Sequence, residues 1–169
     1  GVDVPPPHRL LYRDVRLHGW RPIGDTVIEV DSDTPILWFI TSSASDADQA
    51  SSAGKPVRLR IMAHGYRGPG SSQGGGGVQF CREDINLATI NLLAPLHGKF
   101  TDGVDLYACG VAFITPGYEG RSGDGNVLCS RLAQILGTYV RASTATQFYN
   151  LGTEPAGLDF GRWEGTVLT

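Results

Sequence analysis

Several features that define common functional classes are missing from this sequence of 169 residues. It has no cluster of lysine and arginine, and its formal net charge is -3, so a nucleic acid is not expected as the main partner. The basic residues are spread along the chain, which argues against an electrostatic membrane patch. No apolar run approaches the roughly 20 residues that a membrane-spanning helix needs, and we expect no membrane insertion.

A recognisable signal peptide is also missing, and the first residue is Gly1 rather than methionine. We therefore expect a processed product or an excised domain, from which a targeting signal could have been removed. These observations leave the localisation open.

Cysteine is scarce, because the chain contains Cys81, Cys109 and Cys129 only. An odd number cannot form a complete disulfide framework, although a Cys81–Cys129 bridge stays open beside two reduced thiols. The histidines and cysteines show no zinc-ligand spacing, so neither a metal nor another cofactor is expected. A Gly-x-Ser-x-Gly elbow is missing after His64, which argues against a serine hydrolase of the α/β-hydrolase type.

The composition that is present is typical of one globular domain. Hydrophobic residues make up 41% of the chain and charged residues 18%, which allows a single core over residues 1–169. Residues 1–24 look like a lead-in segment, in which the prolines at 5–7 exclude early helix.

Apolar runs bounded by turn residues predict the order of the elements. Strands are expected at 26–30, 34–40, 57–63, 78–81, 103–108 and 138–142, and helices at 85–99 and 126–136, the latter with Gly137 as its C-cap. The helix at 85–99 presents one apolar face, formed by Ile85, Ile90, Leu92, Leu93 and Leu96. A polar loop is expected at 41–56, with a short helical stretch at 44–50, and a glycine-rich loop at 111–125. Residues 158–169 are predicted to form a hairpin or a terminal strand. Strands that alternate with helices predict an α/β fold with a mostly parallel central sheet flanked by helices.

Two short segments combine a buried strand with a reactive side chain at its end. The run Arg60–Ala63 is followed by His64 and Gly65, and the run Leu106–Ala108 is followed by Cys109 and Gly110. Open α/β sheets bind ligands at the carboxyl ends of their strands. The one helix expected between the two runs makes their strands neighbours, so we expect His64 and Cys109 to lie side by side.

This pairing suits nucleophilic catalysis. Cysteine reacts as its thiolate and needs a base, and histidine can take the thiol proton and return it to a leaving amine. The main-chain amides of Gly65 and Cys109 are the candidates for stabilising an oxyanion. The alternative interpretation is structural, because a cysteine at a strand end is often only packed and a histidine is often only hydrogen-bonded.

The segments Arg60–Gly65 and Leu106–Ala112 resemble the paired blocks of the caspase-like (clan CD) cysteine peptidases. In that group an apolar strand ends in His-Gly and the next parallel strand ends in Ala-Cys. The order and spacing of the segments are most similar to those of bacterial caspase-like domains in large secreted or surface proteins. The resemblance covers roughly residues 34–169. It includes the glycine-rich stretch after His64, the helix at 126–137, the segment 141–144 and the hairpin at 160–167.

The resemblance implies a caspase-like three-layer sandwich and hydrolysis of peptide bonds by a Cys109–His64 dyad, with self-processing as a possibility. The substrate would be a protein or peptide, and the remainder of a larger bacterial surface or toxin protein would be a partner. No third acidic residue is obligatory in the group, so Asp102 and Asp105 are interpreted as strand-flanking polar residues.

The resemblance also indicates where substrate specificity is set. Ala142, Ser143 and Thr144 would line the primary pocket, beside Cys109. An acidic pocket could draw on Asp84, Glu119 and Asp124, and a basic pocket on Arg67, Arg121 and Arg141. The sequence does not choose between them. The alternative function is a catalytically silent caspase-like domain that binds a partner or serves as a scaffold.

Overall fold

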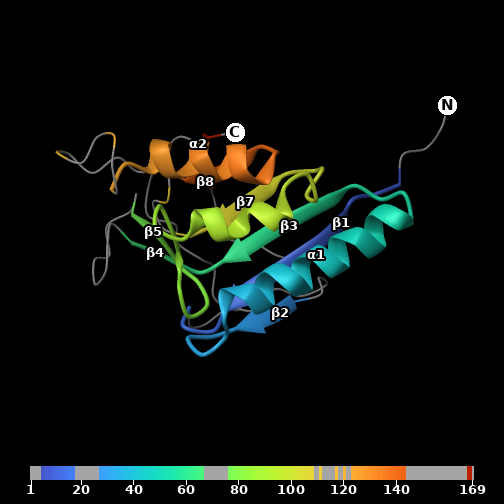
Figure 1. The fold of residues 1–169 in the computed structure, drawn as a ribbon, viewed down its shortest axis with the longest axis horizontal. Coiled ribbons are helices and arrows are strands. Elements are labelled where there is room, and N and C mark those ends of the chain that lie inside the picture. Colours follow the sequence, from blue (N-terminus) through green and yellow to red (C-terminus); the bar gives the residue numbers. More distant parts are fainter. Residues whose placement is uncertain are drawn as a thin grey trace, which may run out of the picture.

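The computed structural model describes residues 5–17, 27–66, 76–108, 111, 117, 120, 123–143, 167 and 168. Figure 1 shows the path of the chain. The described strands are β1 (His8–Asp14), β2 (Val27–Val30), β3 (Val57–Met62), β4 (His64–Tyr66), β5 (Gly77–Gln79), β6 (Ile85–Asn86), β7 (Val104–Tyr107), β8 (Val140–Ser143) and β9 (Val167–Leu168). The described helices are α1 (Ile36–Ser52), the 3-10 helix η1 (Ile90–Leu96) and α2 (Gly125–Leu136).

Six of these strands form the central sheet, in the spatial order β2-β1-β3-β7-β8-β9. The first five are parallel to their neighbours, and β9 pairs antiparallel with β8. The predicted α/β class with a mostly parallel central sheet is therefore confirmed, and the arrangement is compatible with a three-layer sandwich. A smaller antiparallel sheet, β4-β5-β6, begins directly after β3.

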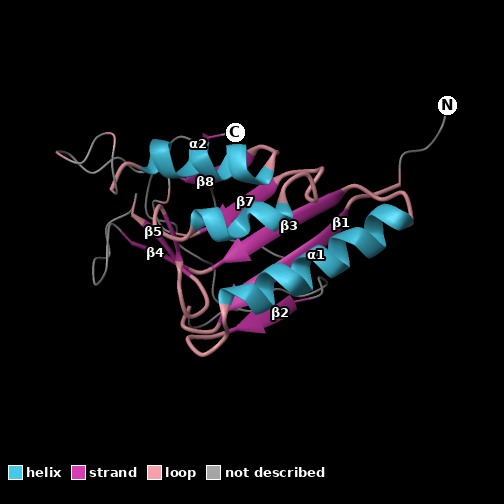
Figure 2. Ribbon diagram, in the orientation of Figure 1, coloured by secondary structure: helices cyan, strands magenta, loops and turns pink. Residues whose placement is uncertain are grey.

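The strand order explains where the helices lie. The connections from β2 to β3, from β3 to β7 and from β7 to β8 all advance in the same direction across the sheet. Because crossovers between parallel strands are right-handed, such connections pass over the same face. In Figure 2, α1, η1 and α2 lie over one face of the sheet, with η1 in contact with both α-helices.

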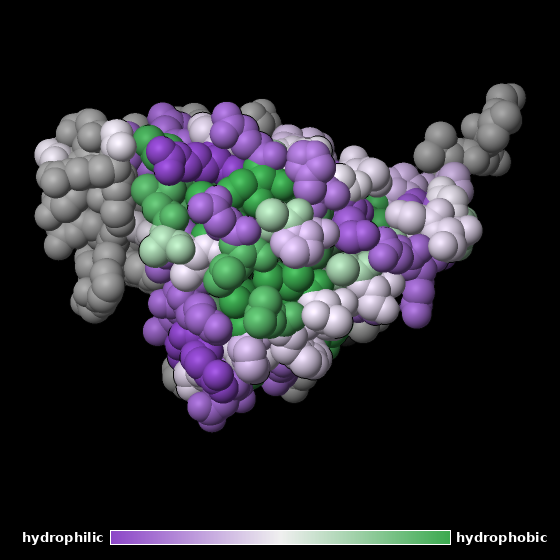
Figure 3. All heavy atoms as spheres, in the orientation of Figure 1, coloured by the Kyte–Doolittle hydropathy of each residue, from purple (hydrophilic) through white to green (hydrophobic). Residues whose placement is uncertain are grey.

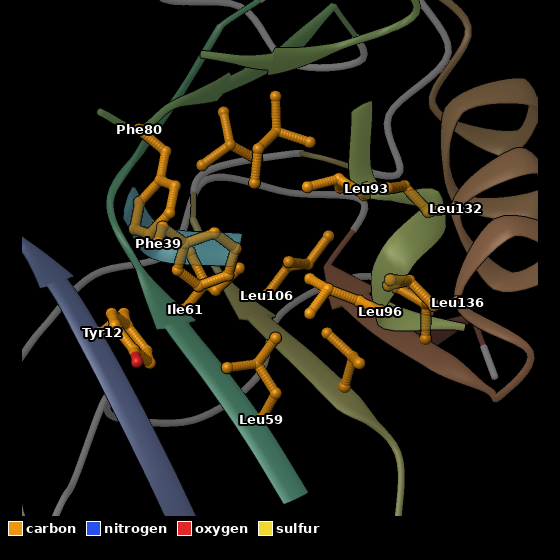
Figure 4. Packing of buried hydrophobic residues seen from close by; sticks show 14 of the residues in the cluster. Tyr12, Phe39, Leu59, Ile61, Phe80, Leu93, Leu96, Leu106, Leu132 and Leu136 are labelled. Carbon is orange, nitrogen blue, oxygen red and sulfur yellow. The ribbon is translucent and has the colours of Figure 1, made fainter. Parts of the chain in front are cut away.

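The main hydrophobic core lies between that face and the helices (Figure 4). Alternate residues of β3 and β7, such as Leu59, Ile61 and Leu106, point into it. Phe39 of α1 packs edge-on against Tyr12 and Phe80, with ring centroids 4.8 Å and 4.9 Å away. These contacts join β1, α1 and the segment after β5 into one packed unit.

The strand predicted at 34–40 is wrong, because these residues belong mainly to α1, and the helix also replaces most of the predicted loop at 41–56. Pro35 precedes the helix, and the Glu83 carboxylate accepts a hydrogen bond from the Ile36 amide at 3.0 Å. The buried positions continue at helical spacing through small residues, namely Ile36, Phe39, Ile40, Ser43, Ala47 and Ala50. Small side chains carry little hydrophobic signal, so only the first, strand-like part of the helix was visible in the sequence. The short helical stretch expected at 44–50 lies inside α1.

The lead-in interpretation of residues 1–24 is also wrong for the part that the structure describes. Directly after the three prolines the chain forms β1, which lies between β2 and β3 in the sheet. Leu11 and Tyr12 are fully buried, on opposite faces. A strand buried on both faces reads as a continuous apolar run, and here charged residues interrupt that run.

The helix predicted at 85–99 forms in a different way. Ile85 lies in β6, and only Ile90–Leu96 is helical, as a 3-10 helix with Pro95 inside it. A 3-10 helix has three residues per turn, so Ile90, Leu93 and Leu96 share the buried face. Leu92, which was assigned to the same face, is 44% exposed.

The other predicted elements are confirmed where the structure describes them. The strands at 26–30, 57–63, 103–108 and 138–142 correspond to β2, β3, β7 and β8, and a short β5 overlaps the one at 78–81. The helix at 126–136 is α2, which ends at Gly137 with φ of 64°. Within 158–169, β9 confirms a terminal strand at 167–168, and the remainder lies outside the described residues.

The helical face carries exposed apolar side chains. Leu37 and Trp38 of α1 and Leu92 of η1 are 62%, 47% and 44% exposed. Figure 3 shows hydrophobic residues gathered over the middle of this face, where α1 and η1 lie. An exposed apolar cluster of this kind is typical of an interaction surface.

Candidate active site

The carboxyl ends of β3 and β7 lie next to each other, as the two motifs predict. The strands are parallel and in register, with Ile61 opposite Leu106 and Met62 opposite Tyr107. The ladder continues one residue further, because the Ala63 amide donates to the Tyr107 carbonyl at 3.1 Å. Ala63 and Ala108, the last residues before the two reactive side chains, are fully buried.

His64 is described and Cys109 is not. His64 begins β4 directly after Ala63, and its side chain is exposed. Cys109 and Gly110 lie outside the described residues, and so does the amide of Cys109 that was a candidate for the oxyanion hole. Ala108 is the last described residue before the cysteine, so the geometry of the dyad itself stays a prediction.

The imidazole of His64 has a defined hydrogen-bond partner. Its Nε2 lies 3.1 Å from the main-chain carbonyl oxygen of Arg16. A carbonyl oxygen only accepts, so Nε2 is the donor and carries the hydrogen. In the neutral ring the other nitrogen, Nδ1, then holds the lone pair. The ring therefore has one nitrogen fixed by the protein and one available as a base.

The main chain around His64 is held by the small antiparallel sheet. His64 pairs with Gln79, and Gly65 pairs with Val78, so β5 runs alongside the candidate base. Gly65, the other candidate for the oxyanion hole, is buried in this ladder. The predicted strand at 57–63 is β3 of the parallel sheet, and His64 directly after it begins β4 of the antiparallel sheet.

Arg16 and the residue that holds it, Asp14, are not among the residues that the sequence predicted for the site. Both lie in the segment interpreted as a lead-in: Asp14 is the last residue of β1, and Arg16 follows two residues later. Asp14 is fully buried and pairs with the Arg16 guanidinium at 2.7 Å. The available signal in the sequence was the short apolar run Leu10–Tyr12 after the prolines, and the structure shows that it belongs to a strand paired with β3.

Comparison of this chain with protein-family models, with curated proteins and with solved structures gives no match. The functional interpretation therefore rests on the residues and their arrangement.

The residues expected to line a substrate pocket have different environments. Ala142 is buried in β8 opposite Leu106, and Ser143 is the last residue of that strand, paired with Val167. Thr144 lies outside the described residues. β8 is the neighbour of β7 on the side away from β3. The segment thus begins at the carboxyl edge of the sheet, on the strand next to the one that leads to Cys109.

Asp124, the acidic candidate for the pocket, caps α2. Its carboxylate accepts hydrogen bonds from the amides of Gly120, Asn126 and Val127 at 2.8, 3.0 and 3.3 Å. The side chain is mostly buried, and these three donors account for its position.

The other charged candidates are either paired or outside the described residues. Asp84 has φ of 65° and accepts a hydrogen bond from the Phe80 amide at 3.2 Å. Arg141 pairs with Asp105. Glu119, Arg67 and Arg121 lie outside the described residues.

Asp105 is a fully buried member of an ion-pair cluster. Arg141 Nε and Arg58 Nη1 lie 2.9 Å and 3.3 Å from its carboxylate oxygens, and the Tyr107 hydroxyl donates to it at 3.4 Å. Asp102 pairs with Arg58 at 3.4 Å and is more exposed. Asp105 therefore links three neighbouring strands of the sheet, and its contacts are those of a structural ion pair.

The two described cysteines are buried and unlinked, so the Cys81–Cys129 bridge left open by the sequence does not form. Burial raises the pKa of both thiols to about 12, which keeps them protonated and unreactive at neutral pH. Among the described residues, no group of histidine, cysteine and acidic side chains is arranged to hold a metal ion. None of the described helices has the length and apolar character to cross a bilayer.

Proposed function

We propose that this chain is a caspase-like cysteine endopeptidase that uses Cys109 as nucleophile and His64 as base. One observation carries the proposal. The parallel strands β3 and β7 are adjacent and in register up to Ala63 and Ala108, and each is followed by one member of the dyad. Adjacent parallel strands lie about 4.8 Å apart, which is suitable for a nucleophile and its base at matching positions.

The orientation of His64 supports the assignment of the base. Its Nε2–H is held by the Arg16 carbonyl, and its side chain is exposed to an approaching substrate. In the proposed reaction, Nδ1 accepts the thiol proton of Cys109, and the thiolate attacks the carbonyl carbon of the peptide bond. The amides of Gly65 and Cys109 stabilise the negative oxygen that forms.

The intermediate collapses when the bond to the leaving nitrogen breaks and the His64 imidazolium returns the proton to that nitrogen. The amine product departs and leaves a thioester on Cys109. His64 then removes a proton from water, which attacks the thioester, and the carboxylic acid product and the free thiol are released. The segment Ala142–Thr144 lines the pocket for the residue on the acyl side of the cut.

The test is cleavage of a diverse peptide mixture, read by mass spectrometry, for the native chain and for Cys109→Ala and His64→Ala. We expect cuts that share one residue on the acyl side, and a loss of about 10⁴-fold or more in either variant. Cys129→Ala is the matched control, because this thiol is on the buried face of α2 and has no part in the proposed reaction.

Two reagents separate cysteine from serine chemistry. Iodoacetamide abolishes turnover and a serine-directed fluorophosphonate leaves it intact if the proposal is correct. Uniform activity across the native chain and both dyad variants contradicts it.

A second function, a catalytically silent binding or scaffold domain, is favoured by a different observation. Leu37 and Trp38 of α1 and Leu92 of η1 are exposed apolar side chains on the helices, which suits contact with the remainder of a larger protein. Resemblance to bacterial domains of secreted or surface proteins supports the same setting, and self-processing there. A folded, thiol-reactive chain that makes no cuts favours this alternative.

A further inference from the structure

The contacts of Asp14 differ from those of an ordinary surface carboxylate. Asp14 ends β1, is fully buried, and accepts four hydrogen bonds. Arg16 supplies three of them, from its amide and its Nε to Oδ1 at 3.0 and 2.8 Å, and from Nη2 to Oδ2 at 2.7 Å. The amide of Cys81 supplies the fourth, to Oδ2 at 3.0 Å. A single carboxylate thus fixes both the main chain and the side chain of Arg16.

The Arg16 guanidinium extends this network across the small sheet. Its Nη2 also donates to the Cys81 carbonyl at 2.7 Å, so Cys81 is held at both its amide and its carbonyl. Cys81 has φ of 59°, a left-handed conformation that side chains other than glycine rarely adopt without such support. The hydrogen bond to Asp14 raises the pKa of Arg16 above its ordinary value, so the guanidinium stays charged.

Both ends of this network lead to His64. At one end, the Arg16 carbonyl lies 3.1 Å from His64 Nε2 and determines which ring nitrogen carries the hydrogen. At the other end, Cys81 follows β5 by two residues, and Gln79 of β5 pairs with the His64 main chain. Asp14 therefore holds the partner of the imidazole and the strand beside its backbone.

We propose that Asp14 is a positioning residue for His64: it fixes Arg16 so that the Arg16 carbonyl keeps His64 in the tautomer with hydrogen on Nε2. Nδ1 then remains the basic atom, aimed away from the Arg16 carbonyl. Asp14 touches neither the substrate nor the reacting atoms, and it acts on the imidazole through Arg16. The effect of Asp14 on catalysis rests on the proposed function, whereas its effect on the His64 tautomer does not.

The test replaces Asp14 by asparagine, which keeps the shape and removes one acceptor. The side-chain NH2 of the asparagine must then face N–H donors of Arg16 or Cys81. These hydrogen bonds are lost, so the Arg16 carbonyl loses its fixed position. In nitrogen-15 spectra of histidine-labelled protein at pH 8, we expect His64 to change from a dominant Nε2–H tautomer to a mixture. His64→Gln identifies the signal among the four histidines.

Peptide cleavage gives the second readout. In Asp14→Asn we expect kcat to fall by about 10- to 100-fold with little change in KM, because a base displaced by a fraction of an ångström loses alignment while the substrate contacts remain. Arg16→Lys tests the same link if Asp14→Asn does not fold, because a lysine ammonium cannot bind the carboxylate in the two-point geometry. It should shift the tautomer in the same direction by a smaller amount.

Asp105→Asn is the matched control, because it also removes a charge from a fully buried, arginine-paired aspartate. It should lower stability and leave the His64 tautomer unchanged. A dominant Nε2–H tautomer in folded Asp14→Asn overturns the inference, and so does an equal tautomer change in Asp105→Asn. If only Asp14→Asn changes the His64 tautomer and the native chain cuts no peptide, the positioning role is supported and the peptidase is contradicted.

Discussion

At the scale of single residues, the stability of the fold depends most on the ion-pair and hydrogen-bond partners of its buried charged side chains. Asp105 is surrounded by Arg141, Arg58 and the hydroxyl of Tyr107, all within 3.4 Å of its carboxylate. A buried carboxylate is stable only while such partners compensate for the water it has lost. Because β3, β7 and β8 each contribute to this cluster, it also fixes the order in which these strands pair.

Asp105→Ala should therefore be strongly destabilising. It leaves two arginines without their shared counter-charge, and we expect the free energy of unfolding to fall by about 3–5 kcal/mol. Urea unfolding followed by circular dichroism measures this change. Asp102→Ala is the control, because Asp102 contacts the same Arg58 from an exposed position, and its loss should cost less than about 1 kcal/mol. Equal losses in the two variants would contradict the structural role of Asp105.

At the scale of elements, α2 has a cap at each end, a side chain at its start and a glycine after its last turn. Asp124 accepts amide hydrogen bonds at its start, and Gly137 adopts a left-handed conformation at its end. The imidazole of His97 donates to the Ile135 carbonyl at 2.9 Å, so this histidine serves the last turn of α2. A β-carbon at Gly137 would lie 2.7 Å from the His97 ring, which excludes larger residues there.

Substitutions of Asp124 distinguish its role as the cap of α2 from a role in the substrate pocket. Asp124→Ala removes the cap and should lower the free energy of unfolding by about 1 kcal/mol, whereas Asp124→Asn keeps an acceptor and should cost only a few tenths. Thermal unfolding of both variants measures the difference. If the carboxylate also recognises a basic substrate residue, Asp124→Asn cuts less after lysine and arginine while its stability stays near native. Equal stability of Asp124→Ala and the native chain would contradict the cap.

At the scale of the whole molecule, the sheet and its helical face enclose three groups that resist ionisation. Burial raises the pKa of Tyr12, Cys81 and Cys129 to about 12 each. In the unfolded chain the same groups ionise near 9 for the thiols and 10 for tyrosine. The folded state therefore keeps protons that the unfolded state releases in alkaline solution.

The free energy of unfolding should accordingly fall as the pH rises above the pKa values that these groups have in the unfolded chain. Below pH 9 both states hold these protons, so the groups add no pH dependence. Between about pH 9 and 12 only the unfolded state loses them, and Cys129 alone lowers the free energy of unfolding by up to about 1.4 kcal/mol per pH unit. Urea midpoints at pH 8, 9, 10 and 10.5 follow the decline, which should be less steep in Cys129→Ala. A Cys129→Ala curve with the native slope would contradict this account.

The parts of the molecule that the sequence predicted well have strong local signals. β3 and β7 each end in an apolar run, at Ile61–Ala63 and Leu106–Ala108, and α2 carries both a capping aspartate and a terminal glycine, so each element is visible without its neighbours. The pairing of β3 with β7 was predicted from the single helix expected between them, and η1 is the helix that lies there. His64 was therefore correctly expected at the carboxyl edge of the sheet.

The parts that were missed depend on contacts between distant residues. The later part of the buried face of α1 consists of Ser43, Ala47 and Ala50, small side chains whose burial is decided by packing against the rest of the molecule. The charged residues in β1 conceal a central strand, because Asp14 is buried only together with its ion-pair partner Arg16. Asp14 reaches Cys81 and Arg16 reaches His64, and no spacing within residues 8–17 indicates either contact.

The central position of β1 also matters during synthesis. β1 pairs with β2 and β3, which are both made after it, and β3 is complete about 50 residues later, or roughly 3 to 10 seconds at common rates of translation. During that interval the apolar side chains of Leu10, Leu11 and Tyr12 have no sheet to enter. Until β3 is made, β1 is thus an apolar strand without its partner on that side, which makes Leu10–Tyr12 a natural binding site for chaperones during synthesis.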